Sequence, residues 1–138
     1  MNRKEIMAIM PHRGDMLLLD EAHVNENGEA EATYTFRGDE TFFSGHFPSN
    51  PMVPGVMLCE FMAQTCCILL KDQAGCQPLY TGLNKVRFRA TVRPGDTIKS
   101  VCKITRHKGP FYFAEGTVTC GDKICLTGEF SFAVYSQE

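Results

Sequence analysis

The feature that most constrains the fold is a long apolar segment, Val56–Leu70, which is followed by a series of strand-like segments. At helical spacing its apolar side chains lie almost all round the axis, which is typical of a helix buried inside a protein. We expect this helix to begin at Gly55 and to end near residue 72. It is too short to span a bilayer and contains Glu60 and Gln64, so we expect no membrane insertion.

The segment before this helix predicts a short helix and a β-hairpin. The short helix is expected at residues 3–9. Residues 16–24 are apolar and strand-like, and Asn27-Gly28 is a strong hairpin signal because both residues tolerate positive φ. The second strand, 29–36, alternates in polarity. Its residues on one face are Ala30, Ala32, Tyr34 and Phe36.

The segments after the helix predict four more strands. Residues 37–54, before the helix, are rich in Gly and Pro and are expected to be irregular. The strands are expected at 79–89, 97–107, 111–120 and 124–135, with turns at 93–96 and 120–123. The economical arrangement is an antiparallel sheet wrapped around the long central helix. We therefore predict an α+β fold with a single domain over residues 1–138.

Charge and cysteine usage exclude several classes of function. The 138 residues carry a formal net charge of -2, so the protein as a whole is not suited to nucleic acid. The 7 cysteines form no Cys-x-x-Cys pair, so neither a zinc site nor a thioredoxin-like motif is indicated, and we expect no metal. The first residues show no apolar signal segment. We expect a reduced, cytoplasmic protein whose cysteines act mainly as small core residues.

One histidine and one carboxyl group are the candidate catalytic residues. His46 lies in a proline-rich loop, and Glu60 stands in an otherwise apolar helix. The prolines restrict the loop and could hold His46 still. Gly55 at the helix start allows a ligand to come close, and the first N–H groups of a helix have no partner within it. These N–H groups could bind an oxygen atom of the ligand.

Glu60 allows two interpretations. A buried carboxyl group is costly unless it is paired or protonated, and a pKa raised by burial suits a general acid. Gln64, one turn later on the same face, could orient it. Alternatively, Glu60 simply reaches solvent or an arginine, and His46 is a structural loop residue. Of the remaining histidines, His12 is expected to cap a helix or to lie on the surface, and His23 and His107 are expected to face solvent.

These residues belong to a longer motif. Residues 42–64 read FFSGHFPSNPMVPGVMLCEFMAQ. They closely resemble the GHFP-x-x-P-x-x-PG and E-x-x-A-Q pattern of 3-hydroxyacyl-[acyl-carrier-protein] dehydratases of the FabZ type, and every position of the pattern is filled. Residues 11–20 resemble the opening PHR…LL-x-D segment of this family. Residues 85–96 resemble its later K-x-R-F-R…PGD segment.

The resemblance implies a hot-dog fold whose active sites lie between two subunits, with His46 from one chain and Glu60 from the other. His46 is then the base on C2 of a 3-hydroxyacyl thioester, and Glu60 is the acid on the leaving hydroxyl group. The Gly55 N–H holds the thioester oxygen, Gln64 and Phe88 contact the substrate, and no cofactor is needed. The related FabA type has Asp in place of Glu60. Residues 14–16 depart from the family's aromatic-Pro-Phe run, which puts the preferred acyl length in doubt.

Two other functions stay open at this point. A hot-dog acyl-thioesterase would use Glu60 to activate water, but it would need no partner such as His46. A module that binds a carrier protein or an acyl chain would need neither residue. One assay with crotonyl and 3-hydroxybutyryl thioesters separates the three.

The partners are expected to be a second copy of the chain and an acyl carrier protein. A helix that is apolar all round is more than one small sheet can cover, which predicts a homodimer, and a trimer of dimers is a further option. Alternation in a strand would place Lys85, Arg87 and Arg89 on one face, where they could dock an acidic carrier protein. Phe88 would then line or gate the acyl tunnel. The alternative is that these cations form a solvated strand face.

Overall fold

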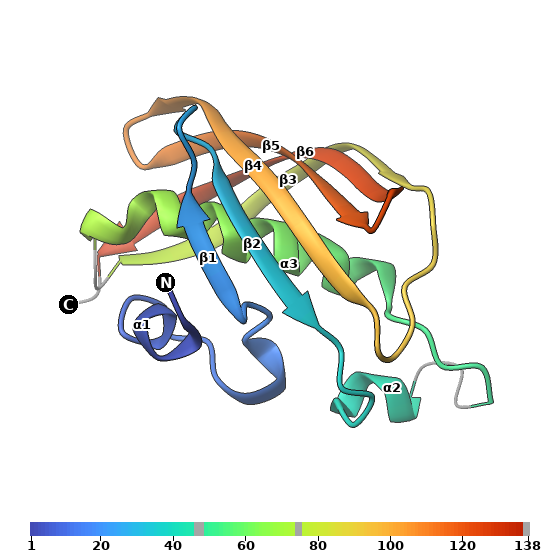
Figure 1. Cartoon of the computed structure of the whole chain (residues 1–138). Coiled ribbons are helices and arrows are strands. Elements are labelled where there is room, and N and C mark those ends of the chain that lie inside the picture. The colour runs from blue at the N-terminus through green and yellow to red at the C-terminus, as the bar shows by residue number, and fades with distance from the viewer. Residues whose placement is uncertain (46–48, 74–75, 137–138) are drawn as a thin grey trace.

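An antiparallel sheet curves around one long helix, α3 (Gly55–Cys67), in the computed structural model (Figure 1), which describes residues 1–45, 49–73 and 76–136. Within these residues the sheet has six strands in the order β1-β2-β4-β5-β6-β3. The strands are β1 (Glu21–Val24), β2 (Ala30–Thr35), β3 (Cys76–Phe88), β4 (Thr97–Lys108), β5 (Phe111–Cys120) and β6 (Lys123–Ser136). The predicted α+β arrangement is confirmed, and the four later strands lie within a few residues of their expected bounds.

The first strand is shorter than predicted. β1 begins only at Glu21, whereas residues 16–24 were expected to be extended throughout. Leu17, Leu18 and Leu19 are fully buried, so their apolar run reflects burial and not strand pairing. The turn at Gly28, with φ of 77°, is where the hairpin was expected. The inward face of β2 is confirmed, since Ala30, Ala32, Tyr34 and Phe36 are at most 2% exposed.

Helix α3 extends from Gly55 to Cys67, and a 3-10 segment, Ile68–Gln73, continues it. Leu70 has non-helical backbone angles inside that segment, with φ of -107°. The expectation of one regular helix to residue 72 was therefore wrong in its last part. Two short helices precede α3: α1 (Arg3–Met7) and α2 (Thr41–Gly45). Asn2 and Glu5 form a capping box at the start of α1, and α2 lies in the segment expected to be irregular.

One face of α3 packs against the sheet. Its buried apolar residues there are Leu58, Phe61, Met62 and Cys66. The sheet comes close to α3 at Gly116 of β5, where an added Cβ would lie 2.9 Å from Met62 Cγ. Gly116 therefore lets helix and sheet approach each other.

The other face of α3 is only partly covered by the described part of the chain. We call it the open stripe, and it consists of Val56, Glu60, Ala63 and Cys67. These positions recur every three or four residues and so share one side of the helix. Val56 is 68% exposed and the other three are half-buried. The expectation of burial on every side was therefore wrong along this stripe.

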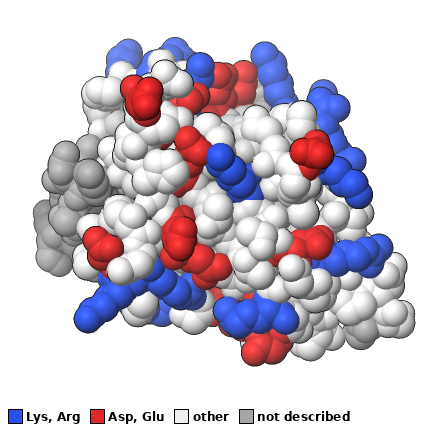
Figure 2. Space-filling model, viewed as in Figure 1, with Lys and Arg blue, Asp and Glu red and all other residues white. Residues whose placement is uncertain are grey.

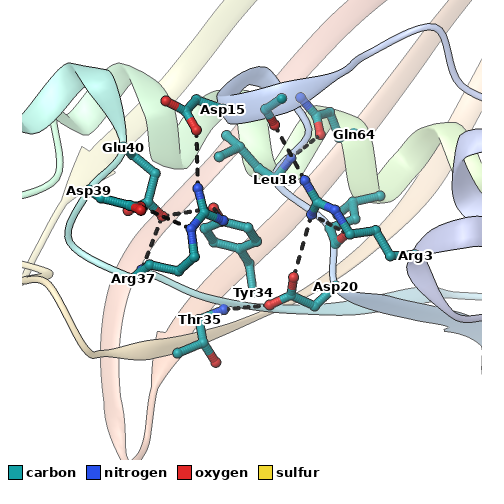
Figure 3. A network of polar contacts seen from close by, with 12 residues as sticks. Arg3, Asp15, Leu18, Asp20, Tyr34, Thr35, Arg37, Asp39, Glu40 and Gln64 are labelled. Atoms are coloured by element: carbon teal, nitrogen blue, oxygen red, sulfur yellow. Dashed lines mark hydrogen bonds and ion pairs between the residues drawn. The ribbon is translucent and has the colours of Figure 1, made fainter.

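A polar network ties the start of α2 to the segment before β1 (Figure 3). Arg37 contacts Asp15 at 3.1 Å and Asp39 at 2.9 Å. Asp15 also accepts a hydrogen bond from the Thr41 N–H at 2.9 Å. The short 3-10 turn Gly14–Met16, which carries Asp15, is thereby joined to the segment that leads toward residue 46.

On the face shown in Figure 2, acidic and basic side chains are interspersed and no large patch of one sign is present. Within the described residues, no helix combines the length and apolarity required to cross a membrane.

Candidate active site

A small pocket opens beside the open stripe of α3. It lies between that stripe, the segment around residue 12, and strands β3 and β6. Its lining residues are His12, Glu60, Ala63, Gln64, Cys67, Tyr80 and Phe132. Most of this lining is apolar or weakly polar, and Glu60 is the one carboxyl group among these seven residues. The pocket therefore has the composition of a site that combines an apolar binding surface with few polar groups.

Glu60 has the environment of a general acid. Its side chain is 23% exposed, and desolvation by burial raises its pKa above the ordinary value. The Oε2 atom is buried and has no hydrogen-bond partner among the described residues. A carboxyl group in this setting holds its proton to higher pH than an exposed one, which is the direction that suits a general acid.

His12 is the residue that sequence reasoning missed. It was expected at a helix cap or on the surface, but its Nε2 lies 4.0 Å from Glu60 Oε1 and its side chain is 22% exposed. Burial lowers the pKa of His12, and the charge of Arg13 lowers it further. The imidazole is therefore neutral at neutral pH. The one available signal was its place in the Pro11-His12-Arg13 segment of the family pattern.

The other two described histidines lie where they were expected. His23 is exposed, with Nε2 3.7 Å from Glu31 Oε2. His107 is exposed and stacks on Tyr112, with ring centroids 5.0 Å apart. Neither lies in the pocket.

Gln64 binds the backbone of the segment before β1 (Figure 3). Its Oε1 accepts the Leu18 N–H at 2.9 Å, and its Nε2 donates to the Met16 carbonyl at 2.7 Å. The side chain is 1% exposed. Among the described residues, Gln64 makes these bonds and none to Glu60, so it anchors the segment around residue 17 to α3. Its expected contact with substrate stays a prediction.

Gly55 begins α3 as expected, and the Phe88 ring lies directly against it. A Cβ at Gly55 would come within 2.7 Å of Phe88 Cε1. Phe88 is nevertheless 56% exposed, so its ring covers the first turn of α3 from the protein surface. Gly55 is therefore required for this close approach. The expected role of its N–H with a thioester oxygen stays a prediction.

His46, the expected base, lies outside the described residues, so its distance from Glu60 is not part of this structure. The described residues that directly precede His46 form α2. Phe42 and Phe43 of this helix pack edge to face against the ring of Phe36.

The three expected docking cations are all exposed, but they do not alternate strictly. The register of β3 with β6 is interrupted between Asn84 and Arg87, and Lys85 has φ of 52°. The expected alternation from Lys85 onward is therefore broken at its first step by a β-bulge. Lys85 Nζ lies 3.9 Å from Glu129 Oε1. Arg87 and Arg89 are exposed next to Phe88.

Solved structures place this arrangement among hot-dog folds. A chain of the dehydratase heterocomplex ApeI:P from Xenorhabdus doucetiae superposes with a TM-score of 0.76 at 18% identity, over 96% of this chain and 91% of that one. The fluoroacetyl-CoA-specific thioesterase FlK superposes with a TM-score of 0.66 at 17% identity, over 84% and 90%. At these identities the likeness shows the fold, and the expected hot-dog fold is confirmed.

Sequence comparison is more specific. The 3-hydroxyacyl-[acyl-carrier-protein] dehydratase FabZ of Clostridium perfringens is 37% identical over 97% of this chain and 99% of that protein. The enzyme of the same name from Petrotoga mobilis is 38% identical, over 97% and 98%. Residues 22–129 match the ApeI-like family model, described as ApeI dehydratase. The chain therefore belongs to the FabZ-type 3-hydroxyacyl-[acyl-carrier-protein] dehydratases, which are hydro-lyases.

Proposed function

We propose that this chain removes water from 3-hydroxyacyl thioesters carried on acyl carrier protein and forms trans-2-enoyl thioesters, in fatty acid or related polyene biosynthesis. The observation that carries the proposal is the Glu60 carboxyl group, which lies in an apolar pocket with a raised pKa. In a FabZ-type dehydratase, such a carboxyl group can donate its proton to the hydroxyl group that leaves the substrate.

The reaction balances with two protein groups. His46 takes the proton from C2 of the substrate, the C2=C3 double bond forms, and the C3–O bond breaks. Glu60 donates its proton to the leaving hydroxyl group, which departs as water. The Gly55 N–H, at the start of α3, stabilises the negative charge that develops on the thioester oxygen. The chemistry requires neither a metal nor an organic cofactor.

One assay tests this function against its alternatives. The purified protein is incubated separately with 3-hydroxybutyryl and crotonyl thioesters of N-acetylcysteamine. We expect each compound to be converted into the other, without release of free thiol. Release of free thiol would identify a thioesterase. If neither interconversion nor free thiol were seen, and the carrier-protein thioesters gave the same result, only a binding function would be left.

Two features support a dimer with shared active sites. The open stripe of α3, which carries Glu60, is only partly covered by the chain's own sheet, and Val56 on it is 68% exposed. Strand β3, at the edge of the sheet, presents Leu79 and Leu83, which are 55% and 51% exposed. An unpaired edge with apolar side chains invites pairing with a second copy.

Mixed dimers test whether the sites are shared. His46→Ala and Glu60→Gln subunits are each inactive alone, but a heterodimer contains one site in which both groups are intact. Co-expression with two different affinity tags, followed by tandem purification, isolates that heterodimer. We expect up to about half of the wild-type activity per dimer. An inactive heterodimer of verified composition means that both groups act within one chain.

Arg87 and Arg89 are proposed to help dock the acidic carrier protein beside Phe88. Both cations are exposed, whereas Lys85 already lies near Glu129. Charge attraction acts mainly on encounter and weakens with salt. The double reversal Arg87→Glu and Arg89→Glu should raise KM for the carrier-protein substrate and leave the N-acetylcysteamine substrate nearly unchanged. Reversal of Lys103 and Lys108 on β4 is the matched control, and equal losses on both substrates contradict docking.

We also propose that the enzyme is cytoplasmic. The described cysteines are free thiols, which a reducing cytoplasm favours.

A further inference from the structure

The segment that carries His12 is fastened to the rest of the protein at several points. The Arg13 guanidinium donates to three carbonyl groups, those of Met10, His12 and Met7, at 2.6, 2.7 and 2.9 Å. A few residues later, Gln64 of α3 binds the backbone on both sides of residue 17. Glu60 lies one turn before Gln64 on α3. The same helix therefore carries Glu60 and holds the segment that places His12 beside it.

The contact between the two side chains involves one oxygen of Glu60 and not the other. His12 Nε2 faces Oε1 at 4.0 Å, which is longer than a hydrogen bond. Catalytic hydrogen bonds are often long without substrate and shorten when it binds, and one water molecule can also bridge such a gap. Glu60 Oε2 and His12 Nδ1 are buried and have no hydrogen-bond partner among the described residues. No described group therefore binds Glu60 Oε2, so the proton on this oxygen is left for a reacting group that enters the pocket.

Burial favours the neutral form of both members of this pair. Burial lowers the pKa of His12 and raises that of Glu60. Arg13, on the same segment as His12, acts against a cationic imidazole. On the side of Glu60, the groups that interact with it are the thiols of Cys59 and Cys67 on α3 and the hydroxyl group of Tyr80 on β3. Burial raises the pKa of each of these three, so they also stay neutral.

We propose that His12 is a positioning residue for the dehydration: its Nε2–H holds Glu60 through Oε1 and leaves Oε2 to give its proton to the leaving hydroxyl group. This inference rests on the proposed function. As the proton leaves Oε2, Glu60 becomes a carboxylate, and a donor on Oε1 binds a carboxylate more strongly than a neutral carboxyl group. The contact is therefore stronger in the transition state than before it, and such a contact raises kcat more than it changes KM.

Two substitutions at one position separate this role from packing. His12→Phe keeps a planar ring and removes the donor, whereas His12→Gln supplies an amide N–H near the place of Nε2. His23→Phe is the matched control, because His23 is exposed and lies away from the pocket. Each variant is assayed for dehydration of the 3-hydroxybutyryl thioester of N-acetylcysteamine, after circular dichroism has shown that it is folded.

We expect His12→Phe to lower kcat by about 10- to 100-fold, the size of a misplaced catalytic group, with KM changed less than about threefold. His12→Gln should recover at least about a third of the lost activity on a logarithmic scale. Because removal of a donor disfavours the carboxylate, the alkaline limb of the kcat profile should move to higher pH in His12→Phe. His23→Phe should match the wild type.

A double-mutant cycle completes the test. If His12 acts only through Glu60, His12→Phe should have little further effect on the residual activity of Glu60→Gln, because residues that act as a unit are not additive. Wild-type rates in His12→Phe, a loss in KM alone, additive losses, or no rescue by His12→Gln would each overturn the assignment. An inactive wild-type protein would instead refute the proposed function itself.

Discussion

Glu40 and Glu60 are two carboxyl groups withdrawn from solvent in the same protein, with opposite surroundings. Glu40 is 1% exposed, and its oxygens accept the Tyr34 hydroxyl at 2.7 Å, the Gly38 N–H at 2.8 Å and the Arg37 N–H at 3.1 Å. Burial alone would raise its pKa, but these hydrogen bonds outweigh burial and lower it. Glu60 is more exposed, yet burial raises its pKa and Oε2 has no partner among the described residues.

The difference shows what separates a structural carboxylate from a reactive carboxyl group. Donors around Glu40 satisfy the charged form, so the group stabilises the turn that leads into α2 (Figure 3). At Glu60 the protein provides burial without enough donors, so the pKa is raised and the neutral form is favoured relative to that of an exposed carboxyl group. The more deeply buried of the two is the one with the lowered pKa, so the number of donors and not the depth of burial sets the direction of the shift.

The largest expected effect separates the two residues by activity. Glu60→Gln removes the proton donor and should lower dehydration by about two to four orders of magnitude, while the fold stays intact. His46→Ala should do the same through loss of the base. Glu40→Gln should retain activity within about tenfold per folded molecule, as rates on the crotonyl thioester measured beside circular dichroism can show. Near wild-type rates in Glu60→Gln or His46→Ala would sink the mechanism.

The second prediction concerns stability, for which Glu40 is expected to matter more than Glu60. Glu40→Gln places an amide against the two backbone N–H donors of residues 37 and 38, so it should reduce the free energy of unfolding by about 1–3 kcal/mol. Glu60→Gln replaces a poorly solvated carboxyl group by a neutral amide and should be neutral or slightly stabilising. Urea denaturation of both variants at one fixed protein concentration tests this, because assembly shifts apparent stability. A greater loss in Glu60→Gln would contradict the comparison.

Local patterns were sufficient for much of this description. The inward face of β2 follows from alternation, and the candidate acid was found because a lone carboxyl group in an apolar helix is unusual. The strand bounds after α3 follow from turn residues such as Gly95 and Gly121, which have φ of 90° and 58°. Each of these signals lies within a few neighbouring residues, so a single sequence displays it.

Features that depend on distant contacts were missed. His12 reaches Glu60 because Gln64 and Arg13 hold its segment, and no local pattern indicates that arrangement. The leucines at 17–19 were assigned to a strand because a short buried run has the same polarity in a strand or an extended loop. The open stripe of α3 was not predicted, since apolar residues all round a helix do not reveal which side its own chain covers.

The smallest expected effect concerns how stability depends on pH. The pKa of Glu40 is lowered by folding, so its contribution is present above the unfolded value of about 4.3 and is lost as pH falls through the folded value. The pKa of Glu60 is raised, so its contribution is present below the unfolded value and is lost as pH rises through the folded value. Relative to the wild type, Glu60→Gln should therefore gain stability as pH rises from 4 to about 7, by at most about 1.4 kcal/mol per pH unit.

Relative to the wild type, Glu40→Gln should be most destabilised near neutral pH, and the difference should shrink as the solution is acidified toward and below the unfolded value. Most groups titrate alike in variant and wild type, so their contributions cancel in the difference. His12 is the exception in Glu60→Gln, because it faces Glu60 and its pKa can change with the substitution. Unfolding free energies of both variants and the wild type, measured from pH 4 to 8 at constant ionic strength, give the two slopes. Slopes of the same sign would mean that one of the two carboxyl groups has been assigned the wrong environment.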